Sequence, residues 1–148
     1  MKFCRDRAGF TLIEMMAGIG VAGLLMAIAM PVFTKTLPGL RLNDAARQVA
    51  TDLQQVRMRA VAQSIPYQIA FSTTTYVVQN CNGTCADVGG NMALPEGITI
   101  TPPSTAPQFQ PRGTVTAAST IRISNGTTNK WVCVKIVGRV NIQDTICT

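Results

Sequence analysis

The chain has 148 residues, a formal net charge of +6 and no histidine, so it has room for a single small domain. Without histidine it lacks the commonest general base and the commonest metal ligand, which argues against most hydrolases and metalloenzymes. It also lacks the serine-hydrolase, phosphate-loop, zinc-protease and dinucleotide-binding motifs, so we predict a protein that is not an enzyme and uses no cofactor or metal.

The first predicted element is an apolar helix behind a short basic leader. Residues 1–9 hold three basic residues and one acidic residue, whereas residues 15–34 hold no charge. About 20 apolar residues are enough to span a bilayer as a helix. Because the basic flank comes first, we expect the leader to stay in the cytoplasm and the C-terminal part to be exported. Glu14, at the head of this helix, is costly near a membrane and needs a partner.

The leader ending in Gly9, the residues Phe-Thr-Leu-Ile-Glu at positions 10–14 and the apolar helix together resemble the signal of type IV pilins and type II secretion pseudopilins. The resemblance implies that a prepilin peptidase cuts between Gly9 and Phe10 and that Phe10 is then N-methylated. It also implies that Glu14 pairs with the amine of Phe10 on a neighbouring or the same subunit, and that Pro31 matches the family's helix proline. Since the cut precedes the apolar helix, the helix survives as an element of assembly with other pilins or pseudopilins.

A second, amphipathic helix is predicted after a break at Pro38 and Gly39. Its apolar residues recur at steps of three and four: Leu42, Ala45, Ala46, Val49, Leu53, Val56 and Ala60. Its polar face carries Arg41, Asp44, Gln48, Asp52, Gln55 and Arg59. We expect the apolar stripe to pack on a sheet, the polar face to meet solvent and Pro66 to end the helix.

From residue 67 onward the period changes to two, which predicts strands. The expected strands are residues 67–72, 75–80, 98–101, 120–124, 130–137 and 140–143, with hairpin turns at residues 125–128 and at Gly138-Arg139. Residues 81–97 and 102–113 are rich in turn formers and are expected to be surface loops. The predicted fold is α+β, with a long N-terminal helix packed on antiparallel strands.

Four cysteines remain once Cys4 is lost with the leader, an even number for an oxidising periplasm. They allow three pairings. We favour Cys81–Cys85, which closes a short loop, together with Cys133–Cys147, which fastens the C-terminal tail. A metal site is disfavoured because the spacing is not Cys-x-x-Cys.

The C-terminal half, from Phe109 to Val140, resembles the GspH/FimT group of minor subunits. That resemblance implies a subunit that primes or joins a pilus or a secretion pseudopilus, and the two machines share the same signal and fold. The alternative it implies is a duplex-DNA receptor in natural transformation, which uses a Gly-Arg-x-Arg motif. Here Gly138 and Arg139 match that motif, whereas Asn141 replaces the second arginine. The candidate DNA contacts are Arg112, Arg122, Lys130, Lys135 and Arg139, which could hold phosphates without sequence specificity.

These patterns divide the chain into a cleaved leader (1–9), a transmembrane and assembly helix (10–37) and a periplasmic pilin-like domain (38–148). We expect a single-pass protein of the inner membrane that also enters the assembled filament. A membrane-anchored binding module that does not assemble is a further alternative. Replacement of Glu14 distinguishes it, since a mere anchor tolerates an apolar residue there.

Overall fold

The computed structural model describes residues 11–147, and for residues 31–35 it describes the backbone alone. The chain divides into two compact units, one ending at Leu37 and the other covering Pro38–Thr148. The predicted cleavage site between Gly9 and Phe10 lies outside the described residues, and so does the side chain of Pro31.

Helix α1 covers Leu12–Gln63 and begins at a capped terminus. The backbone N–H of Glu14 donates to the side-chain oxygen of Thr11 at 3.3 Å and to its carbonyl oxygen at 3.1 Å. Thr11 is therefore the N-cap and Glu14 the third helical residue, which is the Thr-x-x-Glu spacing of a capping box. The helix dipole also favours an anion at this position. The backbone of Glu14 thus completes the cap made by Thr11, and its carboxylate lies at the end of the helix where the dipole favours an anion.

The predicted break at Pro38 and Gly39 is wrong, because α1 remains helical through both residues. A proline inside a helix removes one N–H donor and strains one turn, but it does not prevent helical turns on either side. The turns after Pro38 are held by burial of apolar residues from Leu42 onward. In addition, the side-chain amide of Asn125 donates to the carbonyl oxygen of Pro38 at 3.3 Å.

The predicted apolar stripe of the second unit is confirmed. All of its residues are buried: Leu42, Ala45, Ala46, Val49, Leu53, Val56 and Ala60. The opposite face is exposed apart from Asp52, which is half-buried. The helix ends three residues before Pro66 in a Schellman turn, in which Ser64 has a φ of 55° and the N–H of Ile65 donates to the carbonyl of Ala60 at 3.3 Å.

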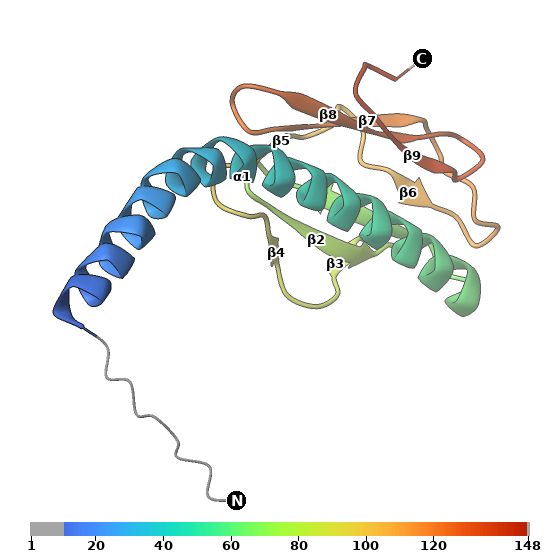
Figure 1. Ribbon diagram of the computed structural model, residues 1–148. Helices are drawn as coiled ribbons and strands as arrows, with labels where there is room; N and C mark the ends of the chain where they lie inside the picture. The colour runs from blue at the N-terminus through green and yellow to red at the C-terminus, as the bar shows by residue number, and fades with distance from the viewer. Residues whose placement is uncertain (1–10, 148) are drawn as a thin grey trace, which may run out of the picture. The chain divides into compact units, whose positions relative to one another are not determined.

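The antiparallel strands of the described chain form two sheets (Figure 1). The first has the order β3-β2-β1-β6, and β4 also pairs with β2. Its strands are β1 (Tyr67–Phe71), β2 (Thr75–Asn80), β3 (Ala86–Asp87), β4 (Met92–Ala93) and β6 (Gln108–Phe109). The second has the order β5-β7-β8-β9. Its strands are β5 (Thr99–Thr101), β7 (Ser119–Ser124), β8 (Asn129–Val134) and β9 (Val140–Gln143).

Both sheets and the second half of α1 contribute to one hydrophobic core. Alternate residues of β7, including Ile121 and Ile123, point into it, as the period of two predicts. The buried Tyr76 of β2 links sheet to helix, since its hydroxyl donates to the carboxylate of Asp52 and accepts from the amide of Gln48. The predicted α+β class, a helix packed on antiparallel strands, is confirmed.

Several predictions for the β half are wrong, and the short strands β3 and β4 both lie within residues 81–97, which were expected to form a loop. Phe109, expected in a surface loop, is fully buried and its strand β6 pairs with β1. A strand of two residues is too short to show an alternating pattern, so the neighbouring turn formers hid it. Conversely, β8 ends at Val134, and the exposed Ile136 and Val137 lie in the turn before Gly138 rather than in a strand.

Candidate functional site

The first candidate site is the apolar part of α1. Leu12–Met30 has a mean hydropathy of 2.1 and could cross a membrane by length and composition, a test that a signal sequence also passes. Every residue from Thr11 to Met30 is exposed in the structure. A continuous apolar surface of this size is stable only in lipid or against other apolar helices. The arrangement therefore fits an anchor, an assembly element or a signal sequence.

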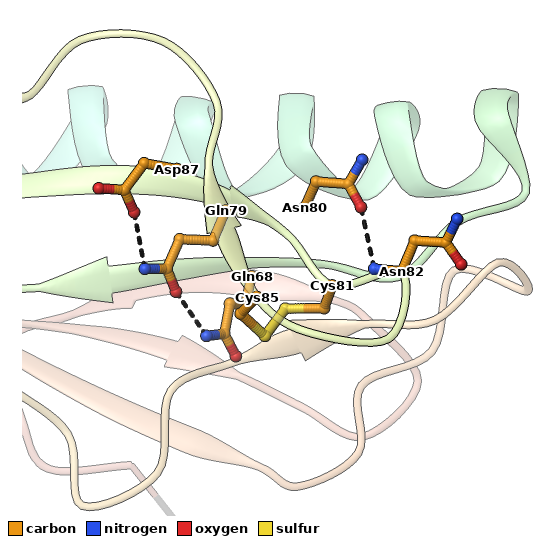
Figure 2. Close-up of a disulfide and its surroundings, with 7 residues drawn as sticks. All are labelled: Gln68, Gln79, Asn80, Cys81, Asn82, Cys85 and Asp87. Carbon is orange, nitrogen blue, oxygen red and sulfur yellow. Dashed lines mark hydrogen bonds between the residues drawn. A yellow bond between two sulfur atoms is a disulfide. The ribbon is translucent and has the colours of Figure 1, made fainter.

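The Cys81–Cys85 disulfide closes the turn that leaves β2 (Figure 2). The N–H of Cys81 donates to the carbonyl of Pro66 at 2.8 Å, which ties this turn to the start of β1. Beside it, the amide of Gln68 donates to Gln79 at 2.6 Å and that of Gln79 to Asp87 at 2.8 Å. These side chains bridge β1, β2 and β3, so the short β3 is held by the disulfide and the polar ladder together.

The Cys133–Cys147 disulfide joins β8 to the C-terminal tail. This pairing and the first are those that we favoured from the sequence. An ion pair between Lys130 and Asp144 provides a second attachment of the tail to β8. Lys130, one of the predicted DNA contacts, therefore already has an anionic partner within the chain.

The predicted DNA contacts do not form one cluster. Arg122 lies in the middle of β7 and donates from Nε to the hydroxyl of Thr101 at 3.2 Å. Lys130 belongs to the next strand, β8, where it lies opposite Ile123 rather than Arg122. Lys135 and Arg139 flank the turn between β8 and β9, and the N–H of Lys135 donates to the carbonyl of Arg139 at 2.9 Å.

Arg112 and Arg139 are brought together by two turns that touch. One is the turn from Gln110 to Gly113, and the other runs from Lys135 to Gly138. A Cβ on Gly138 would lie only 2.0 Å from the carbonyl oxygen of Gly113, so the two backbones are in contact. This contact is the structural reason for glycine at position 138, which also has a φ of 79°. Of the five predicted DNA contacts, Arg112, Lys135 and Arg139 therefore lie on or beside the two touching turns.

Arg57 holds the same two turns from the helix, and the sequence reasoning missed it. Its Nε donates to the carbonyl of Gly113 at 2.9 Å and its Nη2 to the carbonyl of Val137 at 3.5 Å. Arg57 is four residues after Leu53 and three before Ala60, so it occupies a position of the buried stripe. The sequence did hold a signal for this role, namely a charged residue at a position of the otherwise apolar stripe. A half-buried charge needs a specific partner.

Asn141 contributes differently from the arginine that it replaces in the Gly-Arg-x-Arg pattern. Its side-chain oxygen accepts a hydrogen bond from Nε of Arg139 at 3.2 Å. The position therefore orients Arg139 and adds no second cation. Among the described residues 11–147, no group of three or more His, Cys, Asp or Glu is placed to hold a metal ion.

Comparison with known protein families shows which family this chain belongs to. A model of the family described as type II transport protein GspH matches residues 45–138, the amphipathic part of α1 and most of the β half. The chain belongs to the GspH family. A prokaryotic N-terminal methylation motif matches residues 4–30, in front of this domain. The pilin and pseudopilin resemblance inferred from the sequence is thus confirmed.

Individual relatives agree with this membership. The chain is 33% identical over 58 residues to the pilin-like protein PilA1 of Thermus thermophilus, a match that spans 39% of this chain and 36% of the relative. Among solved structures, the minor pseudopilin EpsH from the type 2 secretion system of Vibrio cholerae has a TM-score of 0.58 at 12% identity, covering 70% of this chain and 97% of that one. The type IV minor pilin FimU of Pseudomonas aeruginosa has a TM-score of 0.56 at 20% identity, covering 69% and 92%. These two structures share the fold of this chain.

Proposed function

We propose that the chain is a minor pilin or pseudopilin, anchored in the inner membrane by residues 10–37 and exposing residues 38–148 to the periplasm. The observation that carries the proposal is the uncovered apolar helix Leu12–Met30 directly before a GspH-family domain. In this proposal a prepilin peptidase removes residues 1–9 and methylates Phe10. The helix then leaves the bilayer by packing against the helices of other subunits, in a type IV pilus or a type II secretion pseudopilus.

Processing is tested by the intact mass of protein extracted from membranes. The proposal expects a chain that begins with N-methylated Phe10 and retains all of Leu12–Met30. A product cut after Met30, as by an ordinary signal peptidase, would refute it.

Glu14 variants test assembly, and the capping geometry supplies the matched controls. Glu14→Gln keeps a residue suited to the capping box but removes the charge, whereas Thr11→Ala removes the cap and keeps the charge. If charge pairing sets the register of subunits, Glu14→Gln should insert normally but fall severalfold in sheared filaments, while Thr11→Ala is incorporated almost normally. Normal incorporation of Glu14→Gln would refute the role of the Glu14 charge in setting the register of subunits.

A second candidate function, weak binding of duplex DNA, is favoured by the proximity of Arg112 and Arg139. Neighbouring cations hold phosphates without reading sequence, and each contact adds to the salt dependence. In a mobility-shift titration of the full-length protein, Arg139→Ala should weaken binding and Asn141→Arg should strengthen it, with Arg59→Ala as a control on the outer face of α1. Absence of retardation at low salt, even for Asn141→Arg, would eliminate this candidate.

A further inference from the structure

A cleft of about 640 Å³ lies between the end of α1 and the turn that contains Arg112. We call it the Arg57 cleft and define it by Arg57, Met58, Val61, Ala62, Arg112 and Gly113. Its apolar part is solvent-facing, since Met58 is 63% exposed and Val61 is 49% exposed. Apolar side chains grouped in a concave surface are typical of sites that receive a partner's side chain.

The charged part of the Arg57 cleft is positive and uncompensated. The residues that line it include two arginines and no acid. Arg57 is fixed in place by its bonds to Gly113 and Val137, so its guanidinium is preorganised. Within residues 11–147 the side chain of Arg112 makes no hydrogen bond or ion pair, and it is exposed. A carboxylate is the group that a guanidinium binds best, through two parallel hydrogen bonds.

We propose that the Arg57 cleft docks an acidic segment of a different subunit, one that presents a carboxylate beside a large apolar side chain. The proposal rests on the proposed function, because the partner is a member of the same assembly. The carboxylate pairs with Arg112 and Arg57, while the apolar side chain packs on Val61 and the adaptable Met58.

Two other occupants fit the cleft less well. Duplex DNA would use the arginines but would leave the exposed Met58 and Val61 without a partner, because its backbone offers phosphates and sugars. A second copy of this chain is opposed by long-range repulsion, since residues 10–148 hold ten basic and six acidic residues, a formal net charge of +4 per copy. An acidic partner gains from the same charge through faster association.

The test is peptide binding by the full-length protein in nanodiscs of zwitterionic lipid, followed by fluorescence anisotropy. The probe is a labelled peptide of about ten alternating leucine and aspartate residues, and its counterpart carries asparagine in place of aspartate. We expect the acidic peptide to bind roughly tenfold more tightly than the neutral one. Arg112→Ala should weaken acidic-peptide binding about five- to tenfold, and Val61→Ser should weaken it as well.

Matched substitutions outside the cleft provide the controls. Arg59→Ala removes an exposed arginine from the same helix, and Ile142→Ser removes an exposed aliphatic residue from β9. Each should change affinity less than twofold. The proposal is overturned if Arg59→Ala weakens binding as much as Arg112→Ala, or if the two peptides bind equally. It is also overturned if only a duplex oligonucleotide binds in an Arg112-dependent way.

This assay is separate from the test of the proposed function. Filament incorporation of the Glu14 variants reports on assembly through α1, whereas peptide affinity reports on the Arg57 cleft alone. Loss of peptide binding would therefore refute the docking proposal alone, and normal incorporation of the Glu14 variants would bear on the proposed function alone.

Discussion

Gly138 tests how much stability depends on the contact between the two turns of the second unit. Its φ is 79°, and an added Cβ would lie 2.0 Å from the carbonyl oxygen of Gly113 and 2.8 Å from Nε of Arg57. Gly138→Ala can therefore be accommodated only if the turns separate. Gly126 is the matched control, because it has a φ of 86° but open space around its missing Cβ.

The expected magnitude follows from these contacts. A non-glycine residue in the left-handed region costs about 1–2 kcal/mol in free energy of unfolding, and both variants pay this. Separation of the turns in Gly138→Ala also breaks the Arg57–Gly113 hydrogen bond, and a bond with a charged donor contributes about 1.5–3 kcal/mol. We therefore expect a loss of roughly 2.5–5 kcal/mol for Gly138→Ala and about 1–2 kcal/mol for Gly126→Ala.

Urea unfolding measures both variants, and Trp131 serves as the probe because it is the chain's single tryptophan. The full-length protein should be kept oxidised in detergent so that both disulfides remain in place. The midpoint should fall much further for Gly138→Ala than for Gly126→Ala. If the two variants lose the same stability, the close contact between the turns carries no energy and our account of Arg57 is refuted.

Three further predictions concern the second unit. Burial and a hydrogen bond to a carboxylate raise the pKa of Tyr76 well above its usual value of about 10, so its stabilising effect is present below pH 10 and is lost as the pH rises. Between about pH 9.5 and 11 the free energy of unfolding should therefore fall less for Tyr76→Phe than for the wild type, and Tyr67→Phe is the control. Cys147→Ser should cost about 3 kcal/mol in urea unfolding, the chain-entropy value for a loop of about 15 residues, and unchanged unfolding would show that Cys133–Cys147 does not form. Phe109→Ala should cost roughly 3–5 kcal/mol because the ring is fully buried, whereas a loss below about 1 kcal/mol would place it in a surface loop.

The long periodic segments of this fold were predictable because each repeats one physical constraint many times. The stripe from Leu42 to Ala60 shows the helical period over five turns, and the strands 75–80 and 140–143 were placed with the bounds found in the structure. The strand that contains Phe109 was not predicted, because it pairs only two residues and cannot show a repeated alternation of buried and exposed side chains. A break was predicted at Pro38 because proline is unfavourable inside a helix, whereas burial of the following turns keeps the helix continuous there.

The candidate site was predictable in its composition but not in its geometry. The sequence drew attention to Arg112 and Arg139, and it could not show that their turns touch, since that contact joins residues 25 positions apart. Arg57 was missed because a charged residue within an apolar stripe has no partner in the local sequence. Its partners are backbone carbonyls of two distant turns, and every residue has a backbone carbonyl, so the sequence does not mark these two as acceptors.

The spacing of the four cysteines along the chain favours one order in which the two bridges form. Cys81 and Cys85 leave the ribosome more than 60 residues before Cys147, and the four-residue separation lets them join with little loop-closure entropy. Cys133 instead remains a thiol until Cys147, 14 residues further along the chain, has also emerged. Rapid formation of the Cys81–Cys85 bridge thus removes two thiols that could otherwise pair with Cys133 before Cys147 is available.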